Sequence, residues 1–484
     1  MQLKKKRAGQ LRESIATISA SLLAATITVP AQKAMAQSDY SGSEYYASQL
    51  GGKDDNFGPG RAYTEIETAL LVYKEAGGRV QAIEPATDLT VHGANGQLLN
   101  FGLIADAVSG ATPNGAVPSD LAQTFVTPVK IRGPSSGGGT TTVTSASGGS
   151  TIIHLPTTPG QVSTSARQYT IGANLLPMDR GFHDHRLAFN FGYSQPVGAI
   201  SLIGFGGGYS QEQDYRAITG NVRIAQTFNS GNTTVSLALN TELDSSFPYG
   251  GVPVPLTAMS GVWKTPSSRS KTQAGFVVGI TEVLTRRWLT ELDYSYDAQS
   301  GYMNDPYRIL SVVNPASGEP TGYLYENRPN KRTSQSLFWD NKLDLGPAIT
   351  DVSLRYYKDS WGIASKTAEM SERVNLSGSI YLEPSVRWYQ QSSANFFRNF
   401  LVGGQALPSY ASSDTRLEKF NSMSYGLKLG FKPTGRTEFY VKGGYYQQTG
   451  DGHPADAIGQ LAQQDLFAGS KAAFVFLGYS WDFH

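Results

Sequence analysis

Phe476-Leu-Gly-Tyr-Ser-Trp-Asp-Phe-His484 is the stretch of this sequence that says most about the fold. Its bulky apolar side chains continue an alternation that includes Val475, Leu477, Tyr479, Trp481 and Phe483. The positions between them include Gly478, Ser480 and Asp482. Because successive side chains of a strand point to opposite faces, the pattern predicts a strand with one apolar, aromatic face. Such a strand suits a position half immersed in an apolar medium.

Gly478 followed by Tyr479, Trp481 and Phe483 is similar to the closing-strand signal of bacterial outer-membrane barrels. His484, one residue beyond the usual terminal Phe, is a small departure from that signal. The resemblance implies that the apolar face contacts outer-membrane lipid. It also implies that the outer-membrane barrel assembly machinery is a partner of the chain.

The first residues predict export. Lys4-Lys-Lys-Arg7 is a basic segment, residues 15–29 are mildly apolar, and Ala34-Met-Ala36 fits a cleavage site. We therefore expect a signal peptide over residues 1–36, followed by a periplasmic segment over residues 37–63. A membrane anchor is the poorer alternative, because the apolar part is short and interrupted by Ser and Thr. Cleavage would remove six basic residues and one acidic residue. The mature chain would then have no excess of positive charge, which nucleic-acid binding would require.

The composition favours many strands. The chain has 26 Tyr, 21 Phe, 6 Trp and 53 Gly, but no apolar run long enough for a transmembrane helix after residue 37. Abundant aromatic residues and Gly without long apolar runs are typical of alternating strands joined by tight turns. The absence of Cys excludes disulfides, thiolate metal sites and a lipid anchor on cysteine.

Sixteen alternating segments can be counted within residues 64–484. They are Thr64–Lys74, Arg79–His92, Leu98–Asp106, His185–Gln195, Ile200–Gln211, Tyr215–Asn229, Thr233–Asp244, Lys271–Thr285, Trp288–Asp297, Arg332–Leu345, Ile349–Asp359, Ser365–Leu376, Ile380–Gln391, Phe420–Lys432, Thr437–Gln448 and Lys471–Phe483. Short and long connections alternate between them, as in outer-membrane barrels with periplasmic turns and external loops. We predict an all-β fold, a transmembrane antiparallel barrel of sixteen strands with long external loops. The longest loop is 107–184. A soluble sandwich or propeller is the weaker alternative, because no four-strand repeat is visible.

Several phrases resemble one bacterial family of outer-membrane barrels that is catalogued as a domain of unknown function. These phrases are Ser109-Gly-Ala-Thr-Pro-Asn-Gly115, Asp305-Pro-Tyr-Arg-Ile-Leu-Ser-Val-Val313, Tyr325-Glu-Asn-Arg-Pro329, Tyr356-Tyr-Lys-Asp-Ser-Trp-Gly-Ile363 and Tyr381-Leu-Glu-Pro-Ser-Val-Arg-Trp-Tyr389 with Gln-Gln-Ser after it. The resemblance covers nearly all of the mature chain. It implies the outer membrane of a Gram-negative bacterium, and it carries no catalytic, cofactor-binding or metal-binding residue.

Two loop motifs are rich in charge, Tyr and Pro. Asp305-Pro-Tyr-Arg308 and Tyr325-Glu-Asn-Arg328 are typical of an ordered loop stapled by Arg–carboxylate pairs, and a surface ligand patch is the alternative. His183-Asp-His185 has the spacing of two metal ligands on one strand face. Without an evident third ligand it is better explained as a cluster at the end of a loop. We therefore predict no metal and no cofactor.

Charged residues at the inward positions of the predicted strands are the strongest candidates for a functional site. An acidic wall is predicted on the ninth to eleventh strands, from Glu291, Asp293, Asp297, Asp340, Lys342, Asp344, Asp351, Arg355 and Asp359. A basic wall is predicted on the fourteenth and fifteenth strands, from Lys428, Lys432 and Lys442, with Glu383 and Arg387 between the two walls. These walls would create a field across the lumen. The alternative is that paired charges solvate a water-filled interior.

A sixteen-stranded cylinder is too wide for its wall side chains to fill, so the lumen should hold water or an inserted loop. The leading hypothesis is a water-filled pore for small polar solutes. The second is a non-conducting barrel that binds a ligand or an envelope partner through its external loops. The third is an outer-membrane hydrolase, for which no catalytic motif is evident.

Overall fold

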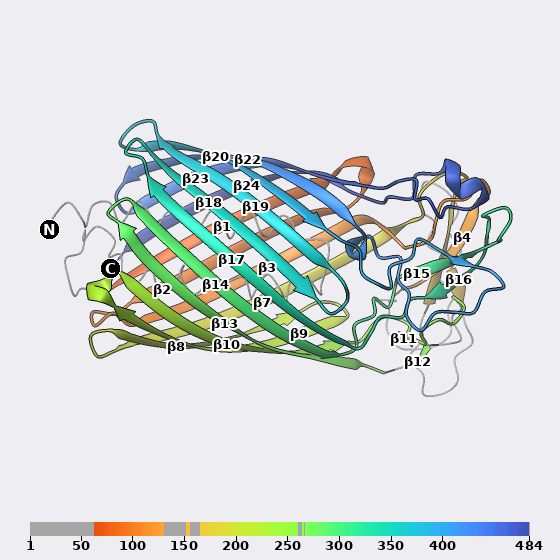
Figure 1. The fold of residues 1–484 in the computed structure, drawn as a ribbon, viewed down its shortest axis with the longest axis horizontal. Helices are drawn as coiled ribbons and strands as arrows, with labels where there is room; N and C mark the ends of the chain where they lie inside the picture. The colour runs from red at the N-terminus through yellow and green to blue at the C-terminus, as the bar shows by residue number, and fades with distance from the viewer. Residues whose placement is uncertain (1–61, 130–151, 155–164, 260–263, 266, 484) are drawn as a thin grey trace.

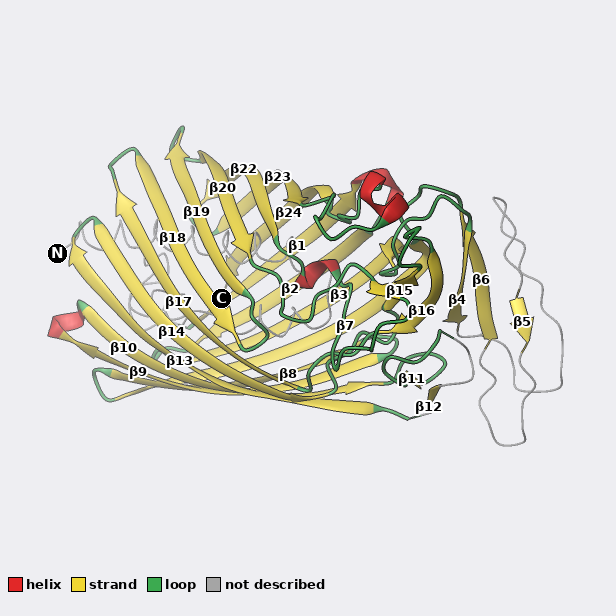
Figure 2. Ribbon diagram, turned by 45° about the vertical axis from the view of Figure 1, so that its right-hand side comes forward, coloured by secondary structure: helices red, strands yellow, loops and turns green. Residues whose placement is uncertain are grey.

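The computed structural model describes residues 62–129, 152–154, 165–259, 264–265 and 267–483. Sixteen of the strands form one closed antiparallel barrel (Figures 1 and 2), which confirms the predicted fold and strand number. In ring order they are β1 (Tyr63–Glu75), β2 (Gln81–His92), β3 (Leu98–Pro113), β7 (Met178–Val197), β8 (Ser201–Gln211), β9 (Tyr215–Phe228), β10 (Thr233–Ser246), β13 (Arg269–Thr285), β14 (Trp288–Gly301), β17 (Lys331–Asp344), β18 (Ala348–Asp359), β19 (Ala364–Asn375), β20 (Ile380–Gln391), β22 (Phe420–Thr434), β23 (Thr437–Gly450) and β24 (Lys471–Phe483).

The barrel closes between its first and last strands. β1 pairs with β24 in antiparallel register, so that Leu70 lies opposite Leu477 and Val72 lies opposite Val475. This pairing leaves neither strand with an unpaired edge, and an unpaired edge would invite aggregation.

The barrel wall is apolar outside and largely polar inside. Exposed side chains recur at alternate positions all round the ring, among them Leu103, Phe205, Leu239, Ile280, Leu354, Leu429 and Leu477. The residues between them include buried charges and amides. This arrangement is the one that lipid-facing barrels adopt, because only the outer face meets hydrocarbon.

The connections differ at the two ends of the barrel. One end has short turns, and the 3-10 helix η2 (Asn229–Gly231) between β9 and β10 is one of them. The 3-10 helix η1 (Ala76–Gly78) joins β1 and β2 at the opposite end, where the long connections lie. The other described helices are η3 (Thr415–Leu417) and η4 (Gly459–Gln463). No helix in the described ranges is long and apolar enough to cross a membrane.

The long connections fold together over one end of the barrel, and we call their described residues within 114–177, 247–268, 302–330, 392–419 and 451–470 the cap. Figure 1 shows its small sheets beyond the barrel wall, at the end where β4, β15 and β16 are labelled. Its strands are β4 (Gln123–Val129), β5 (Ile152–His154), β6 (Ser165–Ile171), β11 (Val252–Pro253), β12 (Lys264–Thr265), β15 (Ile309–Val313), β16 (Pro320–Tyr325) and β21 (Leu401–Val402). β15 pairs with both β16 and β21, which joins two different loops.

The longest loop is shorter at both ends than the predicted span 107–184. β3 and β7 pair from Leu98 opposite Ser194 to Pro113 opposite Met178, so residues 107–113 and 178–184 belong to the wall. The register shifts between Gly110 and Thr112, and Gly110 has a φ of 128°. This bulge interrupts the alternation that identifies a strand in sequence. The predicted signal peptide and nearly all of the segment 37–63 lie outside the described residues.

Candidate functional site

A cavity of about 860 Å³ lies between the cap and the barrel wall, and we call it the chamber. Its walls are inward side chains near the cap ends of strands around the ring, such as Tyr73 of β1, Arg355 of β18 and Arg387 of β20. Its roof comes from the cap, including Phe125 of β4 and Tyr325 of β16. Concave spaces with aromatic walls and a few polar groups are where proteins usually bind small ligands. The chamber is therefore the candidate site.

Buried ion pairs hold the roof together. Arg328 Nε lies 2.7 Å from Glu326 Oε1, and Arg328 Nη2 lies 2.7 Å from Asp414 Oδ2. Arg416 also contacts Asp414, and its Nη2 lies 3.2 Å from Asp305 Oδ2. These contacts confirm the predicted Arg–carboxylate staple within the loop between β14 and β17. They also extend it to Asp414 and Arg416 of another loop, which the sequence analysis missed.

Asp414 is the centre of this ion-pair cluster. Burial alone would raise the pKa of its carboxyl, but the guanidinium groups of Arg416, Arg308 and Arg328 together hold that pKa well below its ordinary value. By contrast, burial raises the pKa of Glu326, which Arg328 only partly opposes. A buried carboxylate shared by three arginines is a strong local constraint, because removal of one partner leaves uncompensated buried charge. The loop between β14 and β17 and the loop between β20 and β22 should therefore move as one unit.

The cap also touches the barrel rim at the connection between β8 and β9. Tyr307 donates a hydrogen bond from its hydroxyl to Asp214, and the backbone N–H of Tyr249 donates to Tyr307 Oη at 3.1 Å. Tyr249 Oη donates to Gln213 Oε1 at 2.8 Å. Burial, aided by Asp184 and Asp305, raises the pKa of Asp214 to about 6. The rim contact therefore contains a carboxyl that titrates within the physiological range.

Among the charged residues that line the chamber, one acidic group and one basic group lie on opposite sides. Asp184, Glu212 and Asp214 line it beside β7, β8 and β9. Arg355 of β18 and Arg387 of β20 line it from the other side. In the closed ring β8 and β20 are eight positions apart out of sixteen, so they face each other across the lumen. A transverse field of this kind orients small dipolar or charged molecules.

The predicted lumen charges are placed at different depths. Asp297, Arg355 and Arg387 line the chamber, and Arg355 lies over the ring of Phe338 at 4.9 Å. Asp359 pairs with Arg332 at the cap end. Buried deeper in the wall are Glu291, Asp293, Asp340, Lys342, Asp351, Glu383, Lys428 and Lys442. Asp344 is near the short turns, where its Oδ1 accepts a hydrogen bond from the backbone N–H of Gly346 at 2.8 Å.

The two predicted walls contain their own counter-charges. Within the acidic wall, Lys342 Nζ lies 2.8 Å from Asp351 Oδ2. Within the basic wall, Glu438 lies 3.7 Å from Lys428 Nζ and 3.3 Å from Lys432 Nζ. Glu438 was not among the predicted lumen charges, although its position in the alternation of β23 marks it as inward. The field across the deeper lumen is accordingly weaker than an unpaired basic wall would create.

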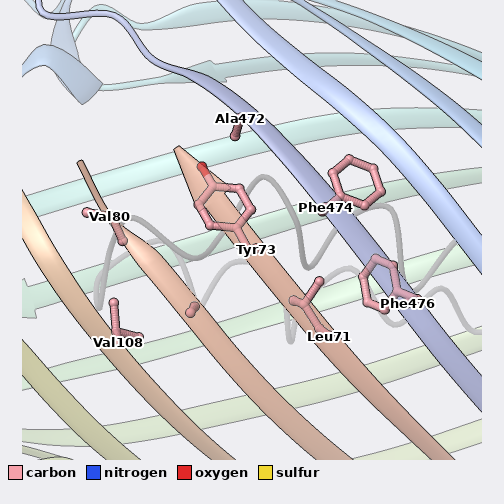
Figure 3. Packing of buried hydrophobic residues seen from close by; sticks show 8 residues of the cluster. Leu71, Tyr73, Val80, Val108, Ala472, Phe474 and Phe476 are labelled. Carbon is pink, nitrogen blue, oxygen red and sulfur yellow. The ribbon is translucent and has the colours of Figure 1, made fainter. Parts of the chain in front are cut away.

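An apolar patch faces the lumen where the barrel closes, and we call it the seam patch (Figure 3). It consists of Leu71, Tyr73, Val80, Ala82, Val108, Ala472, Phe474 and Phe476, with Phe182, Tyr440 and Tyr446 packed against it. Only Gly478, Ser480 and Asp482 were predicted for the inner face of β24. Phe474 and Phe476 continue the same alternation, so the signal was present in the sequence.

His183 and His185 both line the chamber, and His183 Nδ1 lies 2.9 Å from the carbonyl oxygen of Gly181. Within the described part of the chain, no group of three or more His, Asp or Glu side chains is arranged to hold a metal ion. The pair therefore contributes polar lining to the chamber.

Comparisons with known proteins match the chain to one family. A family model described as "Protein of unknown function (DUF3570)" matches residues 20–481, which confirms the resemblance noted in the sequence. None of the curated proteins matches.

Solved structures with a similar chain path include three barrels. CdiB from Acinetobacter baumannii has a TM-score of 0.41 at 9% identity, over 86% of this chain and 60% of that protein. The siderophore receptor PirA from Pseudomonas aeruginosa has a TM-score of 0.35 at 11% identity, over 86% of this chain and 62% of that receptor. The outer membrane protein opdK from Pseudomonas aeruginosa has a TM-score of 0.36 at 7% identity, over 87% and 99% of the two chains.

Proposed function

We propose that this chain, which belongs to the DUF3570 family of proteins of unknown function, is an outer-membrane pore for small polar solutes that is gated by its cap. The apolar outer wall supports a place in a lipid bilayer, because such a surface would aggregate in water. The lumen is lined by charges and amides, which favour water and polar solutes. In this proposal the cap lies outside the cell and the short turns face the periplasm.

The chamber is the observation that supports this function best. It is a polar and aromatic space inside the barrel mouth, and described residues of the cap form part of its lining. A solute that enters would be held there before it passes between the deeper charged walls. Selective channels use such a binding step, because favourable but weak binding raises the chance of entry without blocking exit.

The cap supports a second candidate function, a non-conducting barrel that binds a ligand. The loop between β14 and β17 and the loop between β20 and β22 meet in it through buried ion pairs and the pairing of β15 with β21. A roof of this kind would retain a ligand rather than pass it on. The two functions share the chamber and differ only in whether the cap opens.

Conductance of the purified full chain in planar bilayers tests the proposal. We expect small, intermittent openings for the wild type. We expect longer or more frequent openings for Asp414→Asn, because Arg308, Arg328 and Arg416 would lose the carboxylate that joins them. Asp456→Asn is the matched control, since Asp456 is an exposed carboxyl of the same cap and should leave the openings unchanged.

Folding is checked separately by the heat-modifiable migration of the barrel. Closed traces from both wild type and Asp414→Asn, with migration intact, would rule out a pore and favour the ligand-binding barrel. Esterase and protease assays on the same preparation address the third hypothesis, a barrel hydrolase. Our proposal expects no turnover in them.

A further inference from the structure

Arg387 of β20 is a chamber residue whose hydrogen-bonding capacity is not fully used. Its Nη1 is buried and has no hydrogen-bond partner among the described residues. Arg332 also lines the chamber, but its Nε donates to Asp359 at 2.8 Å and its guanidinium lies over the ring of Trp361 at 4.5 Å. A buried guanidinium nitrogen without an acceptor is unfavourable, and a bound anion would supply that acceptor.

The strand register places a small residue and then an aromatic one on one side of Arg387. In the row of side chains across the wall, Glu369 of β19 precedes Arg387, and Ser424 of β22 and Tyr446 of β23 follow it. Arg387 and Tyr446 both line the chamber, and we call the part of the chamber between them, over the small Ser424, the slot. Neighbouring strands are about 4.8 Å apart, so roughly 10 Å of wall separates the backbones of Arg387 and Tyr446.

Apolar surface begins where this slot ends. Tyr446 packs against the seam patch, and Tyr73, Val80, Val108 and Phe182 of that cluster also line the chamber. Figure 3 shows Tyr73, Val80 and Val108 side by side on neighbouring strands. One end of the slot is therefore cationic and the other end is apolar and aromatic.

We propose that the chamber binds small amphipathic carboxylates, with the carboxylate on Arg387 and an aromatic or short aliphatic body against Tyr446 and the seam patch. The inference rests on the proposed function, because it names the class of solute that the pore would hold. A planar guanidinium matches a carboxylate through two parallel hydrogen bonds. The apolar wall favours a monoanion with a hydrophobic body over inorganic phosphate, which would leave that wall uncovered.

Calorimetric titration of the detergent-solubilised full chain tests the inference without any need for conductance. The probes are benzoate, its neutral counterpart benzamide, and acetate, which lacks the ring. We expect benzoate to bind most tightly. Loss of a charge-assisted hydrogen-bonded pair should weaken benzoate binding at least about tenfold in Arg387→Gln.

Two further variants separate an anchoring role of Arg387 from a structural one. Glu369→Gln removes the neighbouring carboxylate, so benzoate should bind more tightly than to the wild type if Arg387 is the anchor. Arg223→Gln of β9 removes an inward arginine outside the chamber lining and should leave benzoate binding unchanged. Heat-modifiable migration confirms that each variant is folded.

Each result has a defined meaning. Equal binding of benzoate and benzamide, or unchanged benzoate binding by folded Arg387→Gln, would overturn the inference. A chain that conducts but binds none of the three probes would also overturn it, while the proposed pore would stand. Arg387-dependent benzoate binding by a chain that never conducts would support the inference and contradict the pore.

Discussion

Single positions on β24 decide whether a side chain meets the exterior or the lumen. Leu477 is exposed on the outer face and lies opposite Leu70 of β1. Ser480 is on the inner face, with Glu67 of β1 and Glu438 of β23 as its register partners. The same substitution at these two positions therefore tests the sidedness of the wall.

Arg in place of Leu477 should destabilise the barrel by about 2–4 kcal/mol if that position lies near the middle of the bilayer. Arg in place of Ser480 should cost far less, because it would meet two carboxylates. Urea unfolding of both variants in lipid vesicles, followed by tryptophan fluorescence, measures the difference. Equal losses of stability at the two positions would contradict an outer face in lipid.

Sidedness could be predicted from sequence because alternation is a local signal. The pattern Val475, Leu477, Tyr479 contains all the information needed to orient β24. The pairing of Glu438 with Lys428 and Lys432 was not foreseen, because it depends on how β23 lies beside β22. The surroundings of Arg387 were not foreseen either, because its register partner Ser424 on β22 is distant from it in sequence.

At the scale of elements, the cap is held by two contacts that respond to pH in opposite directions. The lowered pKa of Asp414 means that its stabilisation is present above about 3.8 and is lost as the pH falls below that value. The pKa of Asp214 is raised from 3.8 to about 6, so its contribution is present in acid and is lost as the pH rises through about 6. The cap should be most firmly seated between these two values.

Hydrogen exchange of the cap backbone should consequently be slowest near pH 4 and should become faster as the pH rises through about 6, after correction for the intrinsic pH dependence of exchange. Above pH 6 the ionised, buried Asp214 would face Asp184 and Asp305, and this repulsion should loosen the rim contact although the hydrogen bond donated by Tyr307 favours the ionised form. Asp214→Asn should abolish the change in exchange rate near pH 6. It should leave the faster exchange in acid, which depends on Asp414, unchanged. A cap whose protection still falls through pH 6 in that variant would place the titrating group elsewhere.

The cap could be predicted only in part. Its Arg–carboxylate staple was visible because Asp305, Arg308, Glu326 and Arg328 are close in sequence. The junctions between loops were not visible, because they join residues far apart in the chain. Examples are the backbone N–H of Val117 donating to Ser311 Oγ at 3.1 Å and the parallel pairing of Val312 with Leu401. Loop segments also lack the periodicity from which strands are recognised.

For the whole molecule, strand number and closure followed from the alternation of short and long connections, since each pair of antiparallel strands must return the chain to the same side. The distribution of charge inside the barrel also depends on the whole molecule, because it is set by how the strands pair around the closed ring. Lys428 and Lys442 are direct register partners, and Glu383 lies opposite Lys428 on the other neighbouring strand. This part of the wall combines three lysines with Glu383 and Glu438.

Changing Lys428, Lys432 and Lys442 together to Glu should shift ion selectivity towards cations, as charged rings in pores do. The shift should exceed that expected from three new carboxylates alone, because Glu438 would lose both of its lysine partners. Reversal potentials in a potassium chloride gradient measure the effect.

A charge-matched control changes the exposed residues Lys331, Lys358 and Lys419 to Glu and should shift the reversal potential much less, since water and salt screen those positions. Lys442→Gln is a milder companion, because it keeps the contacts of Glu438 and so preserves the fold of the wall. It should move selectivity in the same direction by a smaller amount. If the triple variant conducts normally with an unchanged reversal potential, ions do not pass close to β22 and β23, and the permeation path must follow the opposite wall.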